Sequence, residues 1–538
     1  MTLFFKRNYL FFIGIVSLFL IYRFHDIMWL RPQSIHQWRQ ADCLQIAHNY
    51  LTDSWNFFRP SIHNYFSDGE TSGKTAGEFP LLYFFVALLW KVFGEHEFIY
   101  RMVTLTIFIS GLFALYDLLK KILNNNFWSL AITFFLFTSP VIVFYSNNFL
   151  PNVPAFSFVL IGWNFFYRYY HSKKSKFLFF AIGMFTLGGL FKMTAYISFI
   201  VLGAFYIFEC IKFKILKKEL KIFQNLQTSF FPFLFSLIIM LSWYIYAAYF
   251  TGIHGGKYTF NGLWPIWEMK SSQIEVILDF IKNIIYHQLF SSTALLLIIA
   301  MGIFLFVDYK KTNRFILTSL ALLLIGCTSF IALWFQALEA HDYYVINLLL
   351  FPLFILIGFV WHLKENYQFL FNSKIVQIIF SVFVLCNIFY ASNNIRMRYW
   401  GNLNVSLSVA KILADKPEID YWWWTGSHNS FKALNDIEPY NRSLGIKETD
   451  LVAFIPDQGF STSLYLMNQK GWTSGFGIEN DPNTDPRQRL IDKINSKKLQ
   501  YLFIGDSVTL KKEYLQPFLN NPIGSYKGVL IYSLKETK

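Results

Sequence analysis

An acid flanked by cationic side chains is the first feature of this sequence that could do chemistry. Asp42 is the central carboxylate of "SIHQWRQADCLQIAHNYLTDSW" and the only acid in residues 27–52. Its cationic neighbours along the chain are His36, Arg39 and His48. A positioned carboxylate can accept a proton from a hydroxyl group as that group attacks a reaction centre. Asp42 is therefore a candidate general base, and the simpler alternative is that it caps a helix or pairs with Arg39.

The stretch around Asp42 has the spacing of an amphipathic helix. In "QADCLQIAHNYLT", the polar residues Asp42, Gln45 and Asn49 recur at helical intervals, and apolar residues form the opposite stripe. We therefore predict a surface helix with Asp42 in its first turn. The helix dipole there favours the ionised carboxylate, which is the form that accepts a proton.

A second group of candidates stands at the ends of apolar runs. Glu78 precedes the block "FPLLYFFVALLWKVFG", Arg101 follows it, and Lys192 follows the paired glycines of "GGLFKM". A cation at such a helix break could bind a phosphate group, and the alternative for Arg101 and Lys192 is that they reach from the membrane to the interface. Further polar side chains stand in "EAHDYY", before a late apolar run: His341, Tyr343 and Tyr344. Interfacial tyrosines are also common as belt residues of membrane proteins.

The composition indicates that these residues belong to a membrane protein. The chain has 538 residues, of which 54% are hydrophobic and 15% charged, and its mean hydropathy is +0.37. The net charge of +14 comes from short basic blocks between apolar runs, so it predicts cytoplasmic loops and does not support nucleic-acid binding. Three of the four cysteines lie in apolar runs, which excludes a disulfide framework or a CxxC metal site.

We predict a polytopic α-helical membrane protein with about eleven crossings. Each candidate run is long enough, or nearly so, to cross ~30 Å of hydrocarbon. Under strict alternation the basic blocks fall on one side, which is then the cytoplasm, and the N-terminus lies there too. Residues 79–94 must then form a helix at the outer interface. The candidate spans are 8–27, 99–119, 128–147, 153–170, 177–191, 193–210, 229–250, 290–307, 315–335, 344–362 and 375–392.

The remaining polar chemistry collects on the predicted outer face. The loop 28–98 and the regions of Lys192 and His341 lie there, as does everything after residue 392. From residue 393 the composition turns soluble, with strand-like "DLVAFIP", "YLFIG" and "GVLIYSL" alternating with helical segments at 461–471 and 485–498. We therefore expect two domains, a transmembrane domain (1–392) and an extracytoplasmic α/β domain (393–538).

The order and sidedness of these motifs resemble a known superfamily. Its features are an outer-loop carboxylate after the first span, an "EFPLLYFFVALLWKVFG" block, a "GLFK" break and an "HDYY" segment. This pattern is similar to the GT-C superfamily of integral-membrane glycosyltransferases, especially bacterial relatives of protein O-mannosyltransferases and of the lipid A aminoarabinose transferase. The resemblance covers roughly residues 8–362. It does not extend to the C-terminal domain.

The resemblance implies transfer of a sugar, with inversion, from a polyprenyl-phosphate-linked donor to an envelope acceptor at the outer face of a bacterial cytoplasmic membrane. Asp42 would be the general base and Glu78 the second catalytic acid. Many relatives carry an adjacent Asp-Glu pair where this chain reads "HQWRQAD", so only Asp42 remains here. The resemblance therefore assigns no metal ligands, although a divalent metal is possible. The residues expected to bind substrate are His36, Arg39, Arg101, Lys192, His341, Tyr343 and Tyr344.

Other functions remain open from the sequence. A transporter or flippase of lipid-linked saccharides would place ionisable residues near the middle of the bilayer, whereas these charges stand at the ends of apolar runs. A polymerase or ligase of surface polysaccharide shares the donor and the location, but it would be expected to carry a very large late outer loop. A non-catalytic anchor for the α/β domain would leave the polar residues of the outer face unexplained.

Overall fold

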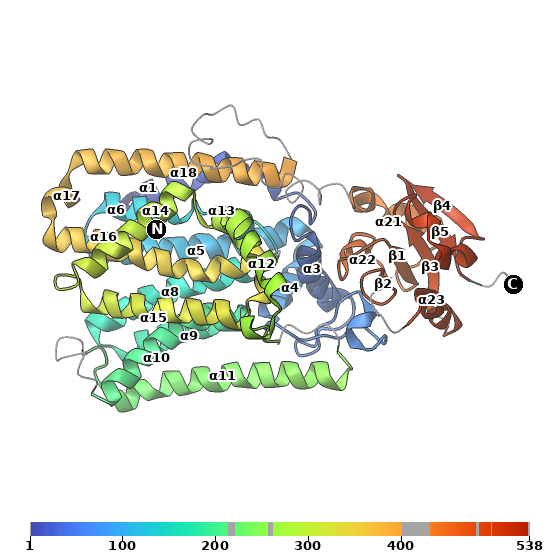
Figure 1. The fold of residues 1–538 in the computed structure, drawn as a ribbon, viewed down its shortest axis with the longest axis horizontal. Coiled ribbons are helices and arrows are strands. Elements are labelled where there is room, and N and C mark those ends of the chain that lie inside the picture. The colour runs from blue at the N-terminus through green and yellow to red at the C-terminus, as the bar shows by residue number, and fades with distance from the viewer. Residues whose placement is uncertain are drawn as a thin grey trace. The chain divides into compact units, whose positions relative to one another are not determined.

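The protein divides into two compact units, each described here by itself. The computed structural model describes residues 2–212, 221–256, 262–339, 341–400, 431–479, 484–496 and 498–535 (Figure 1). The helical unit contains residues 1–29, 100–243 and 262–420, and the mixed unit contains residues 30–99, 244–261 and 421–538. The predicted division after residue 392 differs from this one. The loop 30–99 groups with the C-terminal region because the two are hydrogen-bonded, as where Asn64 Nδ2 donates to the Phe460 carbonyl at 2.6 Å.

The helical unit is built from apolar helices joined by short connections. Its elements are α1 (Thr2–Ile21), α2 (Phe24–Ile27), α5 (Glu97–Leu123), α6 (Asn126–Leu136), α7 (Pro140–Ser146), α8 (Asn152–Ser172), α9 (Ser175–Phe191), η2 (Met193–Tyr196), α10 (Ile197–Cys210), α11 (Leu226–Ile253), η4 (Ile266–Glu268), α12 (Ser271–Phe280), η5 (Ile281–Ile285), α13 (Tyr286–Leu289), α14 (Ser292–Val307), α15 (Arg314–Leu333), η6 (Gln336–Leu338), η7 (Asp342–Leu349), α16 (Leu350–Asn366), α17 (Gln368–Asn372) and α18 (Lys374–Trp400). The division between the units falls within α5 and α11.

This is a multi-pass membrane protein. Among the residues that the structure describes, six helices are long and apolar enough to cross a membrane, or eight spans if each of two bent pairs counts as one. The bent pairs are α6 with α7, at 78°, and Ser271–Leu289 with α14, at 86°. The predicted runs 8–27 and 177–191 are shorter helices, and α18 extends eight residues beyond the predicted end at 392.

The predicted break at Lys192 is present, and its cause is local. α9 ends at Phe191, Lys192 adopts an extended backbone (φ −155°, ψ 117°), and the short helix η2 leads into α10. Gly189 allows η2 to fold back onto α9, because a Cβ atom there would lie 2.6 Å from the Tyr196 ring. The paired glycines thus set the geometry that presents Lys192.

The mixed unit joins the loop 30–99 to a small α/β fold. Within the described residues, its five strands form one sheet in the order β2-β1-β3-β5-β4. β1 pairs in parallel with β2 and β3, and β5 pairs antiparallel with β3 and β4. The elements are α3 (Gln37–Thr52), η1 (Tyr65–Asp68), α4 (Leu81–Phe93), η8 (Lys432–Asp436), α21 (Glu438–Ser443), β1 (Leu451–Ile455), α22 (Thr462–Leu466), β2 (Lys470–Thr473), α23 (Pro486–Asn495), β3 (Leu499–Ile504), η9 (Thr509–Lys511), η10 (Glu513–Phe518), β4 (Pro522–Tyr526) and β5 (Val529–Ser533).

The predicted α/β character of the C-terminal region is therefore confirmed, with two strands that the sequence did not indicate. Both missed strands, β2 and β4, lie at the edges of the sheet. They contain Gly471 and Gly524, and β4 begins at Pro522. Glycine and proline weaken a strand signal in the sequence, but an edge strand can still form by pairing with the strand beside it.

The helix that carries Asp42 differs from the prediction in two ways. α3 begins at Gln37, after His36 in a left-handed conformation (φ 54°), so Asp42 is the sixth residue of the helix and not in its first turn. The helix is also buried on all sides from Arg39 to Tyr50, because α4 and α22 both pack against it. Asp42 is thus neither a surface residue nor a helix cap.

Candidate active site

Two carboxylates of the mixed unit share one guanidinium group. Arg39 NH2 lies 2.5 Å from Glu78 Oε2, and Arg39 NH1 lies 3.9 Å from Asp42 Oδ2. The Arg39 and Asp42 side chains are 2% and 0% exposed, and that of Glu78 is 8% exposed. α3 supplies Arg39 and Asp42 one turn apart, and Glu78 stands just before α4, so the packing of these two helices brings the three groups together.

Neutral hydrogen-bond partners complete this carboxylate cluster. Gln45 Nε2 donates to Asp42 Oδ1 at 2.9 Å, and the Tyr83 hydroxyl donates to Glu78 Oε2 at 2.9 Å. Gln45 is itself held in place, since its Oε1 accepts from the His63 backbone N–H at 2.7 Å. Tyr83 was not among the predicted site residues. Its position on a predicted helix, five residues after Glu78, could have indicated that it lies close to that acid.

Cys43 lies beside the carboxylate cluster, in contact with Tyr83. Cys43 Sγ lies 3.7 Å from the Tyr83 hydroxyl, and its side chain is fully buried. Burial raises the pKa of the Cys43 thiol to about 12, so the thiol is neutral at physiological pH. A neutral buried thiol is a poor nucleophile, which leaves the carboxylates as the reactive groups of the cluster.

The two histidines near Asp42 in the sequence lie at different places on α3. His36 is the residue before the helix, and its ring centroid lies 6.5 Å from that of Trp38. His48 Nδ1 lies 2.8 Å from Glu95 Oε1 and its Nε2 lies 3.9 Å from Glu448. His48 thus belongs to a separate ion-pair group nearly two turns further along the helix.

The helical unit holds the second group of predicted residues, which we call the Lys192 group: Lys192, His341, Tyr343 and Tyr344. Lys192 Nζ lies 4.8 Å from the ring centroid of Tyr344 and 5.9 Å from that of Tyr343. The His341 ring lies 5.5 Å from the Tyr343 ring. Lys192 is 8% exposed, so the residue that was predicted at the break is a largely buried cation against aromatic faces.

A buried ion pair anchors the segment that carries these aromatic residues. Arg398 NH2 lies 2.5 Å from Asp342 Oδ2, with both side chains fully buried. The Tyr145 hydroxyl donates to Asp342 Oδ1 at 2.6 Å, and Arg398 donates to Gln288 Oε1 at 2.8 Å. The pair therefore ties η7 to α7, α13 and α18. Sequence reasoning missed Arg398, because the composition placed it beyond the last span.

Arg101 lies beside the turn between α7 and α8. It is fully buried, its guanidinium donates to the Asn147 carbonyl, and it stacks 4.1 Å from the Phe149 ring centroid. It thus holds the turn between α7 and α8. The same turn leads to Asn152, whose Nδ2 donates to the Tyr343 carbonyl at 3.0 Å, so the turn is part of the support of the Lys192 group.

The two clusters offer complementary chemistry. The carboxylate cluster can accept a proton, and the Lys192 group offers a cation beside aromatic faces, which suits an anionic group attached to an apolar or sugar moiety. Within the described ranges, no group of three or more histidine, cysteine, aspartate or glutamate side chains is placed to hold a metal ion.

A family profile matches the part of the chain that contains several of these residues. The profile described as "Dolichyl-phosphate-mannose-protein mannosyltransferase" matches residues 78–243, which begin at Glu78 and include Lys192. Asp42 and the segment at His341 lie outside the matched range. Among curated proteins, none matches the chain.

Solved structures match the chain over nearly its whole length. The crystal structure of ArnT from Cupriavidus metallidurans bound to undecaprenyl phosphate has a TM-score of 0.57 at 10% identity, over 99% of this chain and 99% of that one. AglB from Archaeoglobus fulgidus, in complex with an inhibitory peptide and a dolichol-phosphate, has a TM-score of 0.52 at 10% identity, over 93% and 70%. Arabinofuranosyltransferase AftD from Mycobacteria has a TM-score of 0.54 at 11% identity, over 98% and 40%.

These likenesses confirm the resemblance inferred from the sequence. At 10% or 11% identity the structural matches establish the fold, which is shared with ArnT, AglB and AftD. The family match over residues 78–243 is to a sugar transferase, a mannosyltransferase. The chain is thus similar in fold to ArnT, AglB and AftD, and its residues 78–243 are similar to a mannosyltransferase family.

Proposed function

We propose that this chain, whose family match and fold are those of membrane glycosyltransferases, transfers a sugar from a polyprenyl-phosphate-linked donor to an envelope acceptor, with inversion, at the outer face of a bacterial cytoplasmic membrane. The observation that carries the proposal is the buried carboxylate cluster, in which Arg39 faces both Asp42 and Glu78. The match to ArnT bound to undecaprenyl phosphate supports the choice of donor class.

Asp42 is the proposed general base. A hydroxyl acceptor is a poor nucleophile, and a carboxylate that takes its proton as the new glycosidic bond forms accelerates transfer by roughly 10²- to 10⁴-fold. Arg39 supports this assignment because it lies closer to Glu78 (2.5 Å) than to Asp42 (3.9 Å). The stronger ion pair holds Glu78 in place, and Asp42 keeps the weaker contact with the cation. Glu78 is then a second acid that positions Arg39.

The Lys192 group is proposed to bind the phosphate of the donor. As the bond between the sugar and phosphate breaks, negative charge develops on the phosphate, and a fixed cation stabilises that charge. Lys192 would supply the cation, with His341 as a further donor, while the Tyr343 and Tyr344 rings would contact the sugar or the first isoprene unit. His36 remains a proposed substrate-binding residue at the start of α3.

The proposed topology has about eleven crossings, with the N-terminus in the cytoplasm and the domain 393–538 outside. Reporter fusions test it. Fusions after Lys121, Lys176 and Lys311 should report the cytoplasm, and a fusion after Asn152 should report the outside. An outward signal at Lys121 would mean that residues 79–94 cross the membrane. α4 supports the proposed interfacial position, since its 13 residues rise only ~20 Å.

The deciding experiment measures sugar transfer by the purified full-length protein in detergent. Polyprenyl-phosphate donors carrying labelled sugars are offered together with acceptor fractions from the bacterial envelope. We expect labelled acceptor and free polyprenyl phosphate, and the anomeric configuration of the product should be opposite to that of the donor. If the protein in vesicles moves the donor between leaflets without cleaving it, the protein is a flippase and the proposal is wrong.

A further inference from the structure

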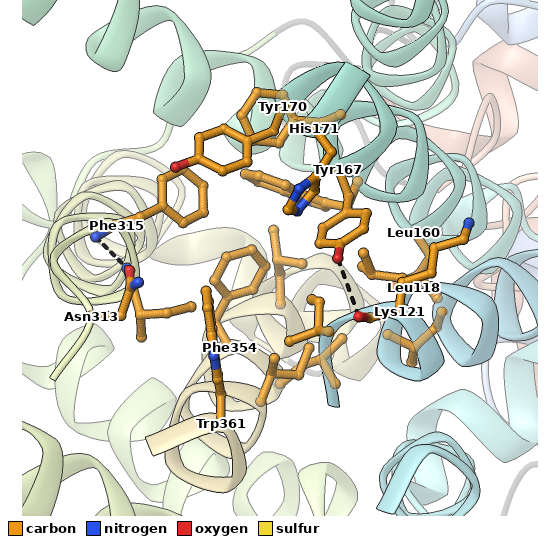
Figure 2. A pocket seen from close by; sticks show the side chains of 18 of the residues that line it. Leu118, Lys121, Leu160, Tyr167, Tyr170, His171, Asn313, Phe315, Phe354 and Trp361 are labelled. Carbon is orange, nitrogen blue, oxygen red and sulfur yellow. Dashed lines mark hydrogen bonds between the residues drawn. The ribbon is translucent and has the colours of Figure 1, made fainter. Parts of the chain in front are cut away.

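The helical unit contains a cavity that the proposed reaction does not use. Its volume is about 400 Å³, within the roughly 300–1,000 Å³ of small-molecule sites. Its walls come from α5, α8, α15 and α16, and Figure 2 shows their side chains around it. The wall is apolar and aromatic, as at Trp163, Phe166 and Phe354, each at most 7% exposed.

One end of the cavity lies at the opposite end of α8 from the Lys192 group. Asn152, the first residue of α8, donates to the Tyr343 carbonyl, while Tyr170 and His171, in the last turn of the same helix, line the cavity. At 1.5 Å per residue, these two ends are separated by ~28 Å. This is close to the ~30 Å thickness of the hydrocarbon core, so this end of the cavity, which we call its mouth, is placed near the opposite membrane interface.

The mouth of the cavity combines cationic and interfacial side chains. Lys121 and Lys364 line it, and Arg168 lies beside it. Lys121 and Arg168 both contact the single carboxylate of Asp117. One acid thus faces two cations, while Lys364 lies 3.6 Å from Glu365, and the mouth keeps an excess of positive charge.

Aromatic side chains with polar tips complete the mouth. The Tyr167 hydroxyl donates to the Lys121 carbonyl at 3.2 Å, as Figure 2 shows, and Trp361 stands on the opposite wall. Tyrosine and tryptophan side chains are characteristic of the level of the lipid headgroups. An apolar interior, a cationic mouth and an aromatic rim match the chemistry of an anionic lipid, and basic pockets between transmembrane helices bind such headgroups.

We propose that this cavity is a binding site for an anionic phospholipid, with an acyl chain in the apolar interior and the headgroup phosphate at Lys121 and Lys364. The site is separate from the proposed transfer reaction, so the binding of this lipid does not depend on the activity of the enzyme. The lipid would tie the ends of α5, α8, α15 and α16 together at this interface.

Native mass spectrometry of the delipidated full-length protein tests the headgroup. The probes are phosphatidylglycerol, phosphatidylcholine and inorganic phosphate. We expect selective retention of phosphatidylglycerol, and about fivefold weaker retention for Lys364→Gln, since one lysine near an anionic surface contributes roughly that factor. Lys310→Gln is the matched control, because it removes a lysine of the α14–α15 connection that is outside the cavity lining.

The acyl chain is tested by filling the cavity. Leu118→Trp places a larger side chain in the lining and should reduce phosphatidylglycerol retention, whereas Leu296→Trp, at a position that is 63% exposed, should not. Leu118→Phe replaces the tryptophan variant if that variant does not fold. Equal retention of the two lipids, or unchanged retention in both Lys364→Gln and the filled variant, would overturn the proposal. Competition by inorganic phosphate at similar concentrations would assign the mouth to a soluble anion instead.

Discussion

Arg39 NH2 lies 2.5 Å from Glu78 Oε2, and both side chains are almost fully buried. Asp42 also faces this guanidinium, so Arg39 contacts two acids in a site with little access to water. The stability of the cluster and its proposed chemistry therefore depend on the same arginine.

Replacing Arg39 should destabilise the mixed unit. Arg39→Ala leaves buried carboxylates without their cation, and removing one partner of a buried ion pair costs about 3–5 kcal/mol. Arg39→Lys should retain part of the stability, since it keeps the charge but cannot pair in the same planar geometry. Thermal unfolding in detergent measures both. The control is Arg23→Ala, which removes a partly exposed pair with Asp26 and a contact with the Trp400 ring, together at a cost of about 2 kcal/mol or less. Equal melting temperatures for Arg39→Ala and Arg23→Ala would contradict the prediction.

Asp42→Asn should abolish most of the transfer activity. The amide preserves the shape of the side chain but cannot accept the proton, so we expect the rate to fall by at least ~10²-fold, or ~2.7 kcal/mol of barrier. Donor binding and the melting temperature should stay near those of the wild type. Asp53→Asn, at the exposed end of the same helix, is the control and should transfer normally. If Asp42→Asn is fully active and Glu78→Gln is not, the base is Glu78.

The sequence predicts those features of the site that depend on local patterns. A pair of glycines followed by a lysine indicated the break at Lys192, and that break is present. Helical spacing indicated the helix around Asp42, but the predicted exposed polar face is buried. The reason is that α22, which begins 410 residues after the end of α3, packs against α3. Hydrophobic periodicity along one segment cannot reveal a partner that distant.

The buried pair of Asp342 and Arg398 shows the same limit at the end of the helical unit. The two residues are 56 positions apart, and Arg398 follows a change in composition that suggests the end of the last span. α18 nevertheless continues to Trp400, because the pair satisfies Arg398 inside the protein. Composition reports average polarity, and one buried arginine within a polar segment does not change it.

Asp342→Asn should destabilise the helical unit strongly. It leaves the Arg398 guanidinium buried without its counter-charge, at a cost of about 3–5 kcal/mol. Donor affinity should fall as well, since Asp342 anchors the segment that contains His341 and Tyr343. Thermal unfolding and donor binding are measured side by side. The control is Asp436→Asn, which removes an exposed pair with Lys527 and should change neither. A melting temperature unchanged by Asp342→Asn would show that the pair contributes nothing to stability.

The stability of the mixed unit should depend on pH through His48. Burial opposes the charged form of this side chain, but the hydrogen bond and charge of Glu95 outweigh it and raise the pKa of His48 above its usual value. Since the folded pKa is the higher one, the stabilisation is fully present below the unfolded pKa of about 6.5 and is lost as the pH rises through the folded pKa. The difference in melting temperature between wild type and His48→Gln should therefore shrink as the pH rises from about 6 to 9. Parallel curves would exclude this linkage.

Lys192→Ala should weaken binding of the polyprenyl-phosphate donor while leaving the carboxylate cluster intact. A hydrogen bond to a charged group contributes about 1.5–3 kcal/mol, so the dissociation constant should rise roughly tenfold to a hundredfold. Lys192→Arg should retain part of the affinity because the positive charge remains. Lys176→Ala is the matched control, since it removes a lysine from the other end of α9. Binding is measured with the intact donor and with polyprenyl phosphate alone, and both should weaken to the same extent if Lys192 contacts the phosphate. If Lys192→Ala binds both ligands as tightly as the wild type, Lys192 serves only to pack against the rings of Tyr343 and Tyr344.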